Sequence, residues 1–173
     1  MNNQHIPGLI ISFVLYLLLQ VTIVRNMVLF DVAFCYVYVA FLLLFPFETR
    51  PALLLIIGFI CGLLIDIFYD TLGMHAAGCV LIAFLRPYWA KAVPPRGGYE
   101  MGMKPTIKVM GFIWFLIFTL PLIFIHHFVL FFVEVGGLHL LGFTIVKVIS
   151  STMLTFLVIV ILQYLFYRSS RRL

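Results

Sequence analysis

The residues most able to do chemistry in this sequence are acids placed inside apolar runs. The stretch GFICGLLIDIFYDTLGMHAAG, residues 58–78, has Gly58, Gly62, Asp66 and Asp70 at intervals of four, so a helix would align them along one face. An ionised carboxylate at membrane depth costs about 2.5 kcal/mol or more on insertion scales. Each such acid therefore needs water, a cation or a proton, and that requirement limits the chemistry it can do.

Hydrolysis by paired carboxylates is the first chemistry to consider. Aspartyl hydrolysis needs two carboxylates that share one proton, and inside a membrane they come from separate helices. Tyr69-Asp70 resembles half of such a site, but no G-x-G-D motif occurs. Glu48 is expected at the opposite side of the membrane, and Asp31 has no supporting motif. No serine has a recognisable nucleophile context, so we expect no enzymatic activity and no catalytic residue.

Metal binding by histidine or cysteine is the second chemistry. His126 and His127 are adjacent, so their rings would point about 100° apart on a helix, and His139 is the only other candidate nearby. We expect these histidines to lie at the outer membrane interface. The three cysteines fall within apolar runs and have no C-x-x-C spacing: Cys35, Cys61 and Cys79. We expect them to be small buried hydrophobes, with no metal, cofactor or disulfide.

The composition indicates that a bilayer is the solvent for these side chains. The chain has 173 residues, of which 65% are hydrophobic and 10% charged, whereas about a quarter of a soluble domain is charged. A hydrocarbon core of about 30 Å needs roughly 20 apolar residues per helix, and the apolar runs do not alternate as barrel strands do. We expect an all-α fold, with one transmembrane domain over 1–173. It would have six spans, at about 7–24, 28–47, 51–69, 73–90, 107–126 and 140–167.

The basic residues predict the orientation of these spans. With six spans both termini share a side, and that side collects the following basic residues: Arg50, Lys91, Arg96, Lys104, Lys108, Arg168, Arg171 and Arg172. The loops on the opposite side contain one basic residue, Arg25. We therefore expect both termini and the linker 91–106 to be cytoplasmic. The net charge of +5 then reflects the orientation of the spans, and the basic residues also attract anionic lipid. Basic residues placed in this way do not indicate nucleic-acid binding.

The two glycines of the opening stretch form a G-x-x-x-G spacing. Gly58 and Gly62 would let another backbone approach closely, which favours helix packing where no hydrophobic effect drives it. Gly73, Ala77 and Gly78 continue the small residues on the next helix. Packing inside one chain and packing against a partner protein both fit this pattern.

Asp66 has several candidate partners. Lys147 is expected at a similar depth near the external end of the sixth span, which makes an intramembrane Asp66–Lys147 ion pair the first expectation. Arg25 and His75 are further candidates. Asp66 acting as a polar anchor for a partner protein, or in proton or solute handling, remains an alternative.

The same residues resemble a known family. Gly58, Gly62 and Asp66, followed by Leu-Gly-Met-His-Ala at 72–76, resemble the signature region of the rod shape-determining protein MreD. The close likeness covers about residues 51–85, and outside it only length and hydropathy agree. The interval between Asp66 and Leu72 is shorter than is usual in the family. The positions that the resemblance ties to the family's architecture, by helix packing or partner binding, are Gly58, Gly62, Asp66, Gly73 and His75.

The resemblance implies a non-enzymatic, multi-pass subunit of the bacterial cytoplasmic (inner) membrane. MreD proteins belong to the cell-elongation machinery that supports lateral peptidoglycan synthesis and rod shape. Their direct partner is MreC, which links them to MreB, RodA and a class B penicillin-binding protein. The family's fold is similar to the six-helix S component of energy-coupling factor transporters.

A substrate-binding S component of a vitamin transporter is the alternative function. It would share the helix count, and Gly8 and Ser12 have the small-residue spacing that such proteins use for coupling to an energising subunit. Against it, the external loops offer few polar groups to hold a vitamin. Those groups are Arg25, Asn26, Glu134 and His139.

The first testable prediction concerns topology. Because the basic residues are concentrated on one side, reporter fusions after Arg96 and after Arg172 should both report the cytoplasm. A fusion at Gly136 should report the outside. An external signal at Arg96 would contradict the predicted map.

Overall fold

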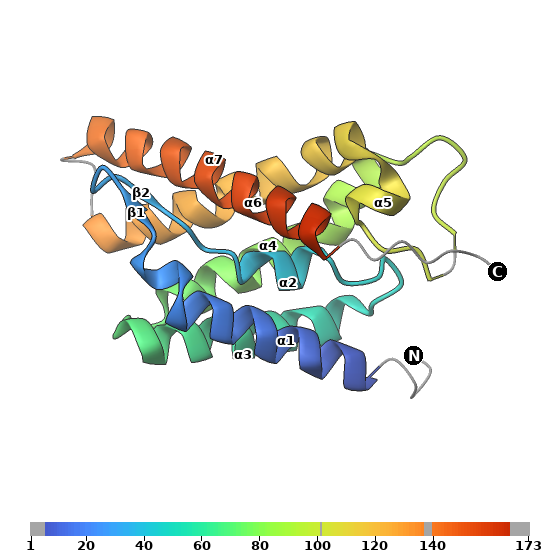
Figure 1. Ribbon diagram of the computed structural model, residues 1–173, viewed down its shortest axis with the longest axis horizontal. Helices are drawn as coiled ribbons and strands as arrows, with labels where there is room; N and C mark the ends of the chain where they lie inside the picture. Colours follow the sequence, from blue (N-terminus) through green and yellow to red (C-terminus); the bar gives the residue numbers. More distant parts are fainter. Residues whose placement is uncertain (1–5, 101, 137–139, 167–173) are drawn as a thin grey trace.

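The computed structural model describes residues 6–100, 102–136 and 140–166, and these form a bundle of helices that run along a common axis (Figure 1). The long helices are α1 (Ile6–Thr22), α3 (Pro51–Tyr69), α4 (Met74–Ala92), α6 (Phe112–Val135) and α7 (Leu141–Leu165). The shorter elements are η2 (Val24–Asn26), β1 (Val28–Leu29), β2 (Ala33–Phe34), α2 (Val39–Leu43) and α5 (Ile107–Met110). The expectation of a mainly helical protein is confirmed.

The helices have the length and composition of membrane spans. Within the described residues, four segments are long and apolar enough to cross a bilayer: Pro7–Asn26, Pro51–Tyr69, Phe112–Val135 and Leu141–Leu165. α4 has the same length as α3 but is less apolar, and it packs beside α3 and α6. These features are those of an all-α membrane protein.

The predicted second span, 28–47, is wrong as a single helix. The chain forms the antiparallel hairpin β1–β2, in which Val28 pairs with Phe34. It then passes through Cys35 and Tyr36 without regular structure, turns at Val37 and Tyr38, and becomes helical only at Val39–Leu43. The reason lies in its composition: the run Phe-Cys-Tyr-Val-Tyr-Val at 34–39 is aromatic and β-branched, and such residues favour extended backbone. Continuous hydrophobicity was mistaken for helical periodicity.

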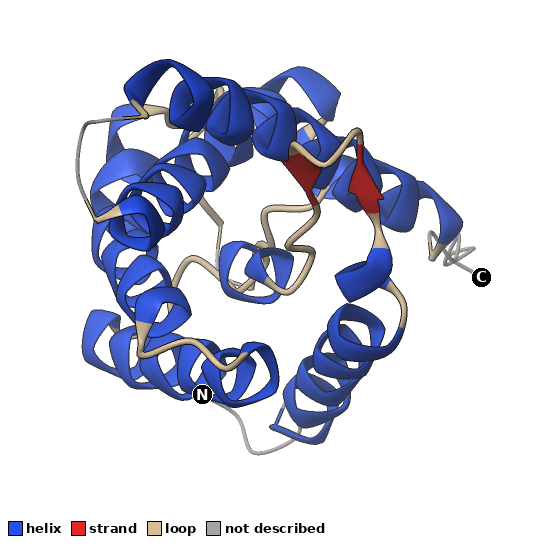
Figure 2. Cartoon of the chain, turned by 90° about the vertical axis from the view of Figure 1, so that its left-hand side faces the viewer, coloured by secondary structure: helices blue, strands red, loops and turns tan. Residues whose placement is uncertain are grey.

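Residues 33–45, here called the central segment, pass through the middle of the bundle. Figure 2 shows the short helix α2 and its flanking loops enclosed by a ring of long helices. Backbone that is not helical is tolerated at membrane depth only where protein surrounds it. The central segment runs from the end that carries the hairpin to the end where α3 begins (Figure 1). α1 begins and α7 ends toward that second end (Figure 1).

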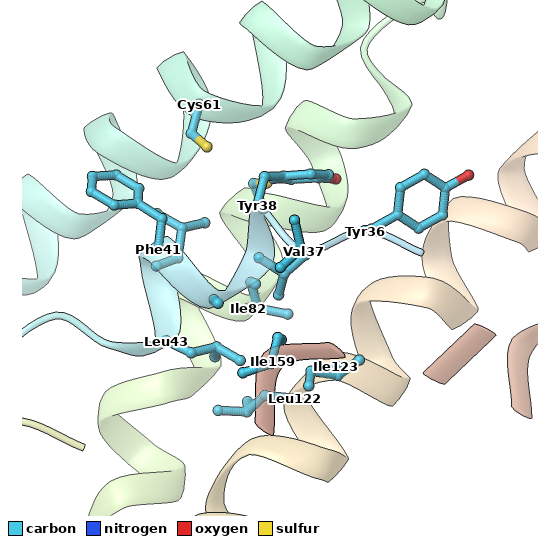
Figure 3. Close-up of a cluster of buried hydrophobic side chains, with 14 of the residues drawn as sticks. Tyr36, Val37, Tyr38, Phe41, Leu43, Cys61, Ile82, Leu122, Ile123 and Ile159 are labelled. Atoms are coloured by element: carbon cyan, nitrogen blue, oxygen red, sulfur yellow. The ribbon is translucent and has the colours of Figure 1, made fainter. Parts of the chain in front are cut away.

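The central segment supplies a large part of the hydrophobic core. Val37, Val39 and Leu42 are completely buried. Figure 3 shows its side chains among residues of four surrounding helices: Cys61 of α3, Ile82 of α4, Leu122 and Ile123 of α6, and Ile159 of α7. The three cysteines are all buried in this core. The segment therefore holds the ring together from inside.

Two glycines bring α3 and α4 into close contact. A Cβ atom added at Gly62 would lie 2.4 Å from Ala76 Cα, and one added at Gly58 would lie 3.1 Å from the Cys79 carbonyl oxygen. Both distances are to α4 of the same chain, so the G-x-x-x-G spacing packs the chain against itself. Gly73 has a different function, because its φ of +84° lies in the region that glycine adopts without steric cost.

We predict that Gly62→Ala destabilises the protein, because the added methyl group would overlap the α4 backbone. The expected loss of unfolding free energy is about 1–3 kcal/mol, as for other overpacked cores, and thermal melting in detergent measures it. Gly142→Ala is the matched control, because a Cβ there meets no atom within 4 Å. Equal melting temperatures for the two variants would contradict the close approach of α3 and α4.

Candidate functional site

The signature residues meet at the turn between α3 and α4. The Asp66 carboxylate accepts hydrogen bonds from the backbone N–H groups of His75 at 3.0 Å and Ala76 at 2.9 Å, and from the Thr71 hydroxyl at 2.5 Å. His75 and Ala76 lie in the first turn of α4, where amide groups have no partner inside the helix. Gly73 precedes that turn and has no side chain with which to cap it. Asp66 therefore caps α4 from the preceding helix, and the positive end of the helix dipole stabilises its charge.

The line of glycines and acids follows from this geometry. Gly62 lets the start of α4 lie directly against α3, and Asp66, one turn further along, then reaches the exposed amides. Asp70 ends α3 in the left-handed conformation with a φ of 54°. The spacing thus joins close packing to capping within one corner, which we call the Asp66 corner (Asp66, Thr71, Gly73, His75 and Ala76).

The expected ion pair between Asp66 and Lys147 is not formed. Lys147 Nζ lies 2.7 Å from Glu134 Oε2, and its ammonium group also lies over the rings of Phe34 at 4.7 Å and Phe131 at 4.4 Å. Lys147 thus joins α6, α7 and the hairpin. The prediction was wrong because depth along a helix was used to infer contact, and a helix N-terminus was not considered as the partner of a buried carboxylate.

Side chains from α1 and α7 bind the backbone of the central segment. The Gln20 amide donates to the Cys35 carbonyl at 3.0 Å and accepts from the Tyr38 N–H at 3.4 Å. On α7, Ser151 Oγ accepts from the Phe34 N–H at 2.9 Å and Thr155 Oγ1 accepts from the Tyr36 N–H at 3.0 Å. A buried backbone group without a partner costs free energy comparable to a lost hydrogen bond. These three side chains take the place of a neighbouring strand.

Arg86 has the same function at the other end of the central segment. Its guanidinium group donates to the carbonyl oxygens of Leu43, at 3.2 Å, and Phe45, and it is only 2% exposed. It also lies over the rings of Phe47 and Phe118. Leu43 is the last residue of the short helix α2 and Phe45 lies two residues beyond it, where the negative end of the helix dipole favours a cation. Arg86 thus lies inside the bundle and caps α2.

Tyr38 connects the central segment to two buried histidines. Its hydroxyl lies 2.7 Å from His75 Nδ1 and 2.8 Å from His126 Nε2. A hydroxyl has one proton to donate, so at least one of the two rings must donate to the Tyr38 oxygen, and the tautomers of the histidines are coupled. His126 Nδ1 is one of two buried polar side-chain atoms without a partner among the described residues; the other is Thr152 Oγ1.

The prediction that His126 and His127 lie at the outer interface is wrong. Both are fully buried, and His127 contacts the Ile123 carbonyl at 2.8 Å and Thr155 Oγ1 at 3.1 Å. His139 lies outside the described residues. No group of three or more His, Cys, Asp or Glu side chains in the described part of the chain is arranged to hold a metal ion.

The structure thus brings the expected site residues of α3 and α4 together, but it separates Asp66 from Lys147. Gly58, Gly62, Asp66 and His75 are buried along the α3–α4 contact, and Gly73 shapes the turn. Sequence reasoning missed four residues that hold the central segment, and Tyr38 within it that bonds to the histidines: the four are Gln20, Arg86, Ser151 and Thr155. Each is a polar residue within an apolar run, and Lys147, Ser151 and Thr155 recur at intervals of four on α7. That polar stripe was a signal available in the sequence.

Comparisons of this chain with protein-family models, with curated proteins and with solved structures found no match.

We predict that Gln20→Leu strongly destabilises the protein. It leaves the Cys35 carbonyl and the Tyr38 N–H buried without their partner, at about 1–3 kcal/mol for each group. Thr22→Val is the matched control two residues further along, because within the described part of the chain the Thr22 hydroxyl bonds only to Leu18 of its own helix. Melting in detergent compares the two variants. A loss for Gln20→Leu no larger than that for Thr22→Val would show that Gln20 does not support the central segment.

Proposed function

We propose that this protein is a non-enzymatic, MreD-like subunit of a bacterial cell-elongation complex in the cytoplasmic membrane. In this proposal both termini face the cytoplasm, and the chain binds MreC and through it acts with MreB, RodA and a class B penicillin-binding protein. The observation that carries the proposal is the Asp66 corner, because the residues of the family-like signature act there as one structural unit. A signature whose members depend on one another is better evidence of resemblance than the same residues scattered over the fold.

The buried polar groups bond mainly to the protein's own backbone, which supports a scaffolding function. Gln20, Arg86, Ser151 and Thr155 each bond to the central segment, and Asp66 bonds to α4. These groups fix the backbone, which is what a rigid binding partner needs. The vitamin-transporter alternative would need polar groups that face a substrate.

The position of the signature also limits where MreC would bind. Gly58, Gly62, Asp66 and His75 are buried against α4 or the core, so their contribution to partner binding would be indirect, through the fold. Direct contacts would come from outer helix faces such as that of α1, whose span is 11% buried within the chain.

Depletion of the protein in its rod-shaped host tests the proposal. Cells should become round, and an MreC-type protein should co-purify with the tagged chain from detergent extracts. Gly62→Ala should reduce both complementation and co-purification in proportion to the loss of folded protein, while Gly142→Ala should complement fully. Depleted cells that remain rods and lose uptake of one vitamin would instead support the S-component function.

A further inference from the structure

A groove lies between α1 and the end of α7, beside α5. It encloses about 560 Å³, within the range of about 300–1,000 Å³ typical of small-ligand sites. Leu15 and Leu19 of α1 form one apolar wall, and Leu162 and Phe166 form the other. The groove is separate from the central segment and from the Asp66 corner.

Polar groups face this apolar groove from both walls. The Tyr16 hydroxyl and the Gln163 amide are among its lining groups, and neither has a hydrogen-bond partner within residues 6–100, 102–136 and 140–166. Lys108 of α5 also lines the groove and brings a positive charge to it. Polar groups with no partner are costly in a bilayer, so an occupant that offers oxygen acceptors next to an apolar chain would be stabilised here.

The dimensions favour a small amphiphile over a spanning helix. The α1 residues that line the groove run from Ser12 to Leu19, which is about 10 Å at 1.5 Å per residue. A transmembrane partner would contact the bundle over much of the hydrocarbon core of about 30 Å. The positive charge of Lys108 beside the groove favours an anionic amphiphile over a neutral one.

We propose that this groove binds an anionic phospholipid from the adjoining leaflet. One acyl chain would lie between Leu19 and Leu162, with the phosphate toward Lys108. Tyr16 and Gln163 would donate hydrogen bonds to the ester oxygens of the glycerol region. This inference does not rest on the proposed MreC binding.

Lipid titration of the purified full-length chain in neutral detergent tests the proposal. Dioleoyl phosphatidylglycerol should raise the melting temperature saturably, dioleoyl phosphatidylcholine should do so only at higher concentration, and inorganic phosphate alone should have no effect. Lys108→Gln should raise the apparent dissociation constant for phosphatidylglycerol about fivefold, the effect of one lysine close to anionic lipid. Lys91→Gln, an exposed lysine outside the groove lining, is the control and should leave binding unchanged.

Two further variants test the groove itself. Leu19→Trp should fill it and abolish the stabilisation by both lipids. Gln163→Leu should weaken phosphatidylglycerol binding without changing the melting temperature in the absence of lipid. If Leu19→Trp does not fold, Gln163→Leu serves as the test of the groove in its place. Equal effects of the two lipids, an equal effect of free phosphate, or equal behaviour of Lys108→Gln and Lys91→Gln would overturn the proposal. A further outcome would also overturn it: folded Leu19→Trp still binds lipid as the unmodified chain does, but no longer co-purifies with a membrane protein. That result would indicate that a helix of a partner protein occupies the groove.

Discussion

The structure depends on one constraint: a length of non-helical chain inside an apolar bundle must obtain its backbone hydrogen bonds from side chains. The central segment meets this requirement through Gln20 on α1, Ser151 and Thr155 on α7, and Arg86 on α4. These residues come from three separate stretches of sequence, and together they fix the positions of three helices around the segment. The central segment therefore serves as both the core and the spacer of the ring.

The Asp66 corner satisfies the same constraint at a helix end. A carboxylate that would be costly in lipid is used to complete the first turn of α4, so two unfavourable features compensate each other. Gly62 makes this possible, because the carboxylate reaches the amides only when the two helices are in close contact. In this corner, packing and electrostatics cannot be changed separately.

Much of the architecture could be predicted from the sequence, namely the membrane character, the long helices near 51–69 and 140–165, and the turn that joins α3 to α4. The second span could not be predicted from hydropathy, because a core segment that is mostly not helical and a spanning helix are equally apolar. Its run of aromatic and β-branched residues at 34–39 was the distinguishing signal. The partner of Asp66 and the burial of His126 and Arg86 depended on contacts between distant segments, which a single sequence does not specify.

The position of the central segment inside the ring of helices has a consequence for biosynthesis. Phe34 and Tyr36 obtain their partners from residues 117 and 119 positions later in the chain, so these bonds do not exist while the early helices enter the membrane. Without α7, a non-helical backbone in lipid would leave these polar groups without partners, at several kcal/mol each. The last helix to be synthesised is therefore the one that completes the hydrogen bonding of a segment near the start of the chain.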